Sequence, residues 1–301
     1  MIIQNNSRIK NIGGQAVIEG VMMKAPGNWT VAVRDRKGDI HIKREQLAQS
    51  PRFLKLPVVR GVIALFQAIT LGIKAIEFSA SKAYDEGTEE SLGKVSIAVT
   101  ILVAFLLGIG LFILLPLYAT KLMGLFFNDI SENSLLFNLT DGIIRVIVFL
   151  LYVVLIGTWK EMARIFKYHG AEHKVIHAYE EGRELTVENV KNYSPLHPRC
   201  GTSFLMIVMV VSILVFSFIP QHWPFIHKFL SRIVLIPFIA GFSFEFLKFS
   251  SKWKNNALMN LLIQPGLLLQ RLTTREPDED QLEVAIRALS EALRLEEENV
   301  R

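Results

Sequence analysis

The stretch VSIAVTILVAFLLGIGLFILLPLYA, residues 95–119, is an unbroken apolar run without a charged side chain. A run of this length exceeds the roughly 20 residues that an α-helix needs to cross the hydrocarbon core of a bilayer. Shorter apolar runs follow at 143–159, 204–219 and 233–247, near or below the lower limit for a span. Hydrophobic residues make up 51% of the 301. The sequence therefore predicts a mainly α-helical membrane protein with about four transmembrane helices.

The distribution of basic residues predicts the orientation of these helices. Residues 1–60 contain eleven Lys and Arg and residues 160–203 contain seven, whereas 120–142 contain one and 220–232 contain two. The positive-inside rule then places the N-terminal segment, the 160–203 loop and the C-terminus in the cytoplasm. This arrangement needs an even number of spans after residue 60. We therefore expect the apolar stretch 61–76 to be an interfacial or re-entrant helix.

Residues 14–46 predict a small β unit before the membrane helices. The runs QAVIEGVMMK (15–24) and WTVAVRD (29–35) are rich in β-forming residues, and RKGD turns the second run into IHIKRE (40–45) as a hairpin. The paired glycines 13 and 14 suggest a tight turn before the unit. A unit of this size cannot form a core alone, so we expect it to pack on the membrane-proximal helices.

The C-terminal segment predicts an amphipathic helix. Its apolar residues at helical spacing are Leu282, Ala285, Ile286, Leu289 and Leu293, and Asp278 or Asp280 is placed to cap its start. We expect this helix to dock on the protein's own soluble part or on a protein partner. The predicted organisation is a cytoplasmic β unit (1–56), an interfacial or re-entrant helix and loop (57–94), a transmembrane pair (95–159), a cytoplasmic loop (160–203), a second transmembrane pair (204–250), and an interfacial segment with the acidic tail helix (251–301).

The stretch YHGAEHKVIHAYE, residues 168–180, carries the strongest chemical pattern. On an α-helix, His169, Glu172, His173 and His177 share one face. Histidines four residues apart can bind one metal ion, and the order H-x-x-E-H places a glutamate as general base beside the second ligand. The run covers about 12 Å along the helix axis, too far for all four side chains to share one ion. The alternative is an interfacial helix with its polar face toward water.

A second polar cluster, SPLHPRCGTSF (194–204), supplies further candidate ligands. His197 or Cys200 could complete a zinc site, and Arg199 could hold an anionic substrate. The alternative is a cap and turn before a membrane helix, with Cys200 as a small buried residue; Cys200 as a nucleophile with His197 as its base is a weaker reading. Glu19 and Glu245 are additional candidates, because each carboxylate lies in an apolar context and needs a partner.

Five blocks together resemble a known family. The blocks are GGQAVIEGVMMKAP (13–26), RGVIAL (60–65), YHGAEHKVIHAYE (168–180), HPRCGTSF (197–204) and LTTREPDEDQLEVAIRAL (272–289). In this order they are similar to the YqhQ-like bacterial family, whose domain has no assigned function and whose members are described as predicted metal-dependent membrane enzymes. The resemblance covers about residues 12–293. It implies a membrane protein with a metal-type motif and does not indicate the reaction.

The favoured function from sequence is metal-dependent hydrolysis at the cytoplasmic membrane surface, with zinc as the ion. His169 and His173 would bind the ion, Glu172 would act as general base, and His177 or His197 would be a third ligand or an acid. The substrate would be a lipid, a lipid-linked phosphate or a membrane peptide. The rivals are a non-enzymatic metal-sensing or metal-handling protein and a membrane scaffold. Residues 1–275 carry the net positive charge of the chain. We expect this part to contact membrane lipids and not nucleic acid, because no nucleic-acid recognition motif accompanies its charge.

Overall fold

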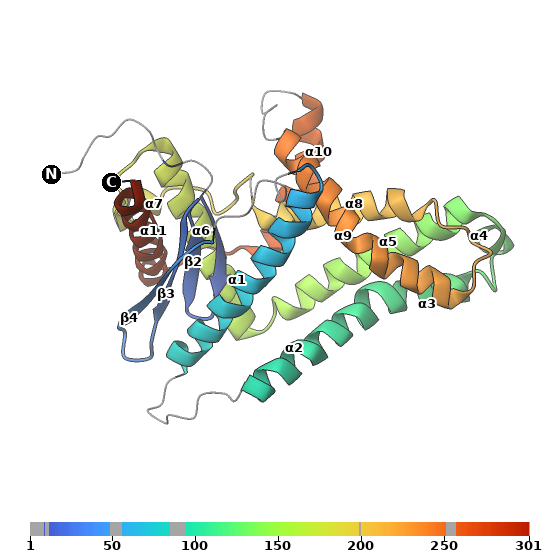
Figure 1. Ribbon diagram of the computed structural model, residues 1–301, viewed down its shortest axis with the longest axis horizontal. Coiled ribbons are helices and arrows are strands. Elements are labelled where there is room, and N and C mark those ends of the chain that lie inside the picture. The colour runs from blue at the N-terminus through green and yellow to red at the C-terminus, as the bar shows by residue number, and fades with distance from the viewer. Residues whose placement is uncertain are drawn as a thin grey trace.

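The computed structural model describes residues 9, 12–48, 56–84, 94–198, 200–250 and 257–300. The chain is mainly helical, with one four-stranded antiparallel sheet near its N-terminus. Figure 1 shows the sheet and its covering helices at one end of the molecule and a bundle of long helices extending away from them. The predicted fold class is confirmed.

The sheet is a meander in which each strand pairs with the next. Its strands are β1 (Gly13–Val17), β2 (Gly20–Lys24), β3 (Asn28–Arg34) and β4 (Ile40–Gln46). The run 15–24, expected as a single stretch, is a hairpin in which Val17 pairs with Gly20. Glu19 forms the turn with a φ of 51°, an uncommon conformation for a non-glycine residue. Gly13 and Gly14, expected in a turn, lie in β1.

Helices cover both faces of this sheet, as the limited size of the β unit requires. Helix α1 (Val59–Ala83) packs on one face, where Leu71 and Ala75 meet Trp29, Val31 and Val33. On the other face lie α6 (Lys160–Glu181), the short α7 (Val187–Val190) and α11 (Glu279–Val300). Side chains on a strand alternate between the two faces, so the run of apolar residues in β3 serves both cores.

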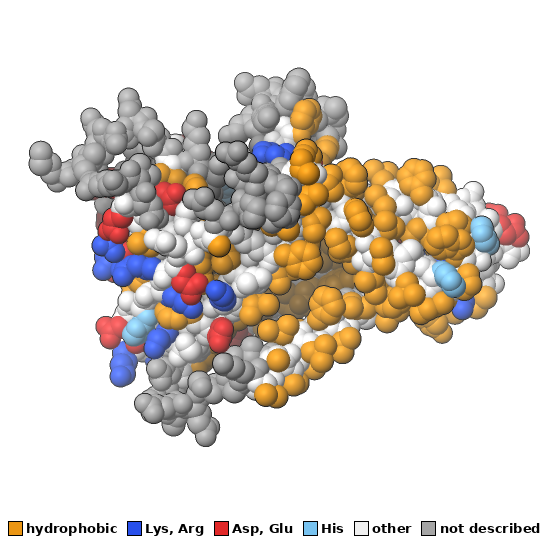
Figure 2. All heavy atoms as spheres, viewed as in Figure 1, with side chains coloured by type: hydrophobic (Ala, Val, Ile, Leu, Met, Phe, Trp, Pro, Cys, Tyr) orange, Lys and Arg blue, Asp and Glu red, His pale blue; other side chains and the backbone are white. Residues whose placement is uncertain are grey.

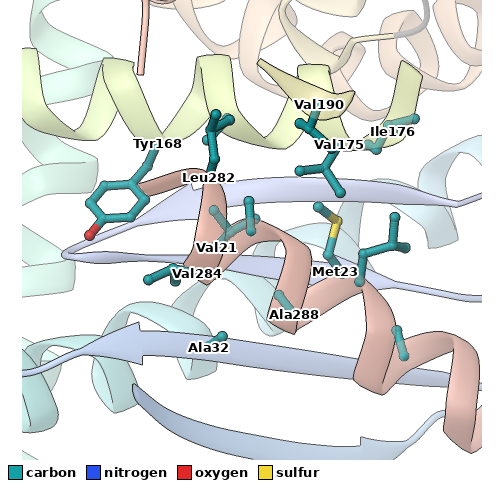
Figure 3. Packing of buried hydrophobic residues seen from close by; sticks show 14 of the residues in the cluster. Val21, Met23, Ala32, Tyr168, Val175, Ile176, Val190, Leu282, Val284 and Ala288 are labelled. Carbon is teal, nitrogen blue, oxygen red and sulfur yellow. The ribbon is translucent and has the colours of Figure 1, made fainter. Parts of the chain in front are cut away.

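Figure 3 shows how α6 and α11 close the second core. Leu282, Val284 and Ala288 of α11 pack with Val21 and Met23 of β2. Two hydrogen bonds tie the helix to β3: Thr30 Oγ1 donates to the Ala288 carbonyl at 2.7 Å, and Asn28 Nδ2 donates to the Ala292 carbonyl at 3.1 Å. The tail helix therefore docks on the sheet of its own chain, in agreement with the first of the two predicted places.

The bundle is built from long apolar helices. Its elements are α2 (Lys94–Ile109), the π-helical turn η2 (Gly110–Leu114), α3 (Leu115–Met123), the short α4 (Asn128–Glu132), α5 (Ser134–Ile156), α8 (Gly201–Phe216) and α9 (Phe225–Ser250). Large apolar side chains such as Leu107 and Phe218 are 67% and 85% exposed. Figure 2 shows hydrophobic side chains over the bundle and charged side chains over the sheet end. Such a surface fits lipid and not water.

Four helices in the described part of the chain are long and apolar enough to cross a membrane: Val59–Ala83, Ala98–Met123, Ser134–Ile156 and Phe225–Phe249. The number agrees with the prediction, but the two sets differ: Val59–Ala83 is in the set from the structure, and the predicted span 204–219 is not. The segment 61–76, expected as an interfacial or re-entrant helix, belongs to the continuous 25-residue α1. The segment 204–219 falls largely in α8, which has only 16 residues. Figure 1 nevertheless shows α8 running beside α9 within the bundle.

Helices α1 and α10 (Ala257–Thr273) lie where the bundle meets the sheet end (Figure 1). The start of α1 crosses α9 at Gly61, where a Cβ would come within 2.8 Å of the Gly241 Cα, so both backbones need glycine to approach. Helix α10 continues through Pro265. Gly266 of α10 packs against Ser203 of α8.

The two ends of the molecule allow a direct test of orientation. Asp129 is exposed at the far end of the bundle and Lys37 is exposed in the β3–β4 turn. A membrane-impermeant maleimide added to intact cells should label Asp129→Cys and leave Lys37→Cys unlabelled until the cells are permeabilised. Wild-type protein, whose one cysteine Cys200 is buried, supplies the background signal. Labelling of Lys37→Cys in intact cells would overturn the predicted orientation.

Candidate metal centre

Helix α6 carries the histidine motif without interruption. It runs from Lys160 to Glu181 and ends at Gly182, whose φ of 74° is the left-handed conformation that commonly terminates helices. Gly170 lies inside the motif, where the backbone of Arg275 crosses the helix. A Cβ on Gly170 would come within 2.0 Å of the Arg275 carbonyl oxygen. The absence of a side chain at Gly170 therefore lets the 273–275 segment contact α6.

The two central histidines are each oriented by a backbone carbonyl. His169 Nδ1 donates to the Thr273 carbonyl at 2.8 Å, and His173 Nδ1 donates to the Pro195 carbonyl at 2.6 Å. Each Nδ1–H bond leaves a lone pair on Nε2, the arrangement by which backbone groups orient histidine ligands. The Nε2 atom of His173 is buried and has no hydrogen-bond partner among the described residues. Both rings are therefore set to bind through Nε2.

Cys200 is the third member of the group. It is the N-cap residue of α8, and its Sγ lies 3.2 Å from His169 Nε2. One ligand atom from each of His169, His173 and Cys200 lies within 4.8 Å of the other two. Imidazole nitrogen and thiolate sulfur are the donors of zinc sites. The unpartnered nitrogen of His173 and the donor set both fit a metal ion at this place.

Burial controls the protonation of these ligands. Burial and the neighbouring His169 lower the pKa of His173 to about 2, so its imidazole is neutral, the form that binds metal. Burial raises the pKa of the Cys200 thiol. A metal ion must displace that proton, so affinity at this site should rise with pH.

Glu172 is buried beside the three ligands. Burial raises the pKa of its carboxyl group to about 8, while His169 and a hydrogen bond from the Gly14 backbone N–H act in the opposite direction. Its Oε2 atom has no hydrogen-bond partner among the described residues. A nearby cation would favour the carboxylate form of such a group. Gly14 leaves the space for this side chain, since a Cβ there would lie 2.8 Å from Glu172 Cδ.

His177 and His197 extend the row of rings but lie outside the group of three. The His177 and His197 ring centroids are 4.4 Å apart, and those of His173 and His197 are 5.8 Å apart. His177 Nε2 donates to the Leu196 carbonyl at 2.9 Å, while His197 Nε2 lies 3.6 Å from a Glu180 carboxylate oxygen. The axial length of the motif thus separates His177 from the ligands near Cys200.

The other sequence candidates lie elsewhere. Glu19 forms an ion pair with Arg164 and accepts a hydrogen bond from the Tyr168 hydroxyl at 3.3 Å. Glu245 pairs with Arg60, whose Nε donates at 2.6 Å, and so connects α9 to α1. Arg199 lies outside the described residues.

Several residues that shape the centre carried no sequence signal. Gln270 is fully buried in α10; its Oε1 accepts from the His197 N–H at 2.8 Å, and its Nε2 donates to the His197 carbonyl at 2.9 Å. The carbonyls of Thr273 and Pro195 orient the two histidines. A backbone carbonyl can belong to any residue, so its role cannot be read from a side-chain pattern.

The geometry predicts which histidines the protein needs in order to bind a metal ion. His169→Ala and His173→Ala should each reduce the metal content of the purified protein well below stoichiometric, because each removes one of three ligand atoms. His41→Ala should not change it, since His41 pairs with Asp35 in the sheet end. Elemental analysis of the three variants is the measurement. Equal metal content in all of them would rule out this centre.

The contact between Gly14 and Glu172 predicts a contrast between neighbouring glycines. Gly14→Ala places a methyl group 2.8 Å from both Glu172 Cδ and the Met22 carbonyl oxygen, whereas a Cβ on Gly13 meets no heavy atom within 4 Å. Overpacking of this kind costs about 1–3 kcal/mol. Thermal unfolding in detergent should show a lower midpoint for Gly14→Ala and little change for Gly13→Ala. Equal midpoints would contradict the contact.

Comparisons with known proteins identify a family and leave the reaction open. The family model described as a protein of unknown function, DUF1385, matches residues 56–295. The uncharacterized protein YqhQ of Bacillus subtilis (strain 168) is 36% identical over 299 residues, which cover 94% of this chain and 92% of that protein. No solved structure matches. The chain therefore belongs to the DUF1385 family.

Proposed function

We propose that this protein is a zinc-dependent hydrolase that acts at the cytoplasmic surface of the cell membrane. One observation carries the proposal: His169 Nε2, His173 Nε2 and Cys200 Sγ converge, and both histidines are oriented through Nδ1 by backbone carbonyls. Surface histidines do not need such orientation. A ligand set does, because its lone pairs must meet at one point.

The donor set favours zinc and leaves room for chemistry. Two imidazoles and one thiolate suit zinc better than the oxygen-preferring ions calcium and magnesium. Catalytic zinc sites commonly have three protein ligands and one open position. When bound, zinc makes a coordinated water a stronger acid and polarises the scissile group.

Glu172 is the residue suited to move the proton. It precedes His173 in the chain, and its carboxyl group is close enough to His169 and Cys200 for their charges to act on it. As the carboxylate it would accept a proton from the attacking water and return it to the leaving group. The backbone N–H of Gly14 in β1 donates a hydrogen bond that helps to position this carboxyl group.

The place of the centre supports a membrane-bound substrate. Cys200 caps the helix α8, which runs into the bundle, and Thr273 ends α10 at the same junction. In the proposed arrangement α2–α3, α5, α8 and α9 cross the membrane, and α1 lies along its cytoplasmic surface with its second half on the sheet. A lipid, a lipid-linked phosphate or a membrane peptide would reach the centre from that surface.

A non-enzymatic metal-binding function is the alternative, and the burial of the centre favours it. His173 is 1% exposed, Glu172 is 5% exposed and Cys200 is 8% exposed. Closed sites are typical of structural metal ions, whereas a catalytic centre must admit its substrate. In this alternative the ion holds α6, the turn before α8 and the 273–275 segment together.

Glu172→Gln separates the two functions. Gln is nearly the same size but cannot accept a proton, so the variant should retain fold and metal and lose about 10²-fold or more of turnover. The measurement is complementation of a deletion strain at matched expression, with metal content determined in parallel. His41→Gln serves as a control for substitution outside the centre. Failed complementation with normal metal content would support catalysis, whereas full complementation with metal bound would contradict it.

A further inference from the structure

A cavity of about 320 Å³ opens at the end of the bundle farthest from the sheet. Its wall is formed by the end of α3, by α4 and the start of α5, by residues 221–223 and by the start of α9. Lys121 and Lys228 line the cavity, together with the hydroxyl-bearing Ser131 and the aromatic rings of Phe137 and Trp223.

The two lysines face this cavity without a carboxylate. Lys228 is only 7% exposed, and its Nζ lies 4.2 Å from the Phe137 ring centroid. Lys121 Nζ lies 5.7 Å from the centre of the Phe225 ring. Among the described residues neither lysine forms an ion pair. The charged groups that act on the Lys228 ammonium are Arg232 and Lys121, and both are cations.

Buried charges next to the cavity increase the positive excess. Arg145 Nη2 lies 2.5 Å and Arg232 Nη2 lies 3.2 Å from the same oxygen of Asp141. Asp141 and Arg232 are fully buried, so solvent does not screen them well. One carboxylate neutralises only one of the two guanidinium groups. Ionisable side chains inside membrane bundles are costly and commonly mark ligand or ion sites.

The acidic side chains of α4 do not line this cavity. Asp129 and Glu132 of α4 line a separate, open depression with Asn133, Ser134 and Leu136. The wall of the cavity therefore has two lysines, His222, other hydrogen-bonding groups and aromatic rings, and the described residues that form it include no acidic side chain. A buried ammonium that lacks an anion is stabilised when an anionic ligand supplies one.

We propose that this cavity binds a phosphate group. The two ammonium groups would neutralise its charge, and lysine is a common phosphate ligand in proteins. Trp223 is 40% exposed, and Trp is enriched where membrane helices meet the headgroup layer. The phosphate can belong to a lipid headgroup or to a soluble compound. This site is independent of the metal centre at the other end of the bundle.

Ligand-dependent thermal stability of the purified full-length protein in detergent tests the proposal. The probes are inorganic phosphate, short-chain dihexanoylphosphatidic acid, and dihexanoylglycerol as the control without phosphate. At least one phosphate probe should raise the unfolding midpoint saturably, since a ligand that binds only the folded state stabilises it. Lys121→Gln and Lys228→Gln should each weaken the apparent affinity by about tenfold or more, the scale of one charge-assisted contact. Lys37→Gln, at an exposed turn, should not weaken it.

The pattern across the probes identifies the source of the phosphate. Stabilisation by phosphatidic acid alone supports a lipid headgroup, and stabilisation by inorganic phosphate supports a soluble ligand. If Lys228→Gln fails to fold, Lys121→Gln still decides, because Lys121 is exposed. No saturable effect of either phosphate probe, equal effects of dihexanoylglycerol, or unchanged affinity in Lys121→Gln would overturn the site.

Discussion

The crossing of the 273–275 segment over α6 at Gly170 is the contact on which the arrangement of the molecule depends. The absence of a side chain at Gly170 lets the Arg275 carbonyl approach, and the Arg275 N–H donates to the Phe166 carbonyl at 2.9 Å. The same crossing brings the Thr273 carbonyl to His169 Nδ1. It also joins the helix α10, which packs on α8 in the bundle, to α11, which packs on the sheet. The close approach of the Arg275 backbone to Gly170 thus connects the sheet end, the bundle and the candidate metal centre.

The metal centre and the cavity with Lys121 and Lys228 lie at opposite ends of the bundle and use different chemistry. In the centre, backbone carbonyls orient the two histidines His169 and His173. The cavity has an excess of fixed positive charge beside the buried cluster of Asp141, Arg145 and Arg232. If the bundle crosses a bilayer as proposed, the candidate metal centre and the proposed phosphate site lie at opposite faces of the membrane.

The sequence alone determined the class of the protein and the core of the metal motif. Long apolar runs have few stable environments other than a bilayer, so their length identifies bundle helices without knowledge of the tertiary structure. Helical periodicity places His169, Glu172 and His173 on one face, because residues three and four apart are neighbours on a helix. The same periodicity identified the apolar face of α11. These features are local, and a local pattern can be read along the chain.

Tertiary structure decided which residues meet across long separations. It selected Cys200, and not His177, as the third member of the group, because the turn before α8 folds back to the middle of α6. It paired Glu19 with Arg164 and Glu245 with Arg60, which removes both carboxylates from the centre. These contacts depend on how separate helices pack. Spacing along one helix cannot encode that packing, since each partner lies on a different element whose position is set by the whole fold.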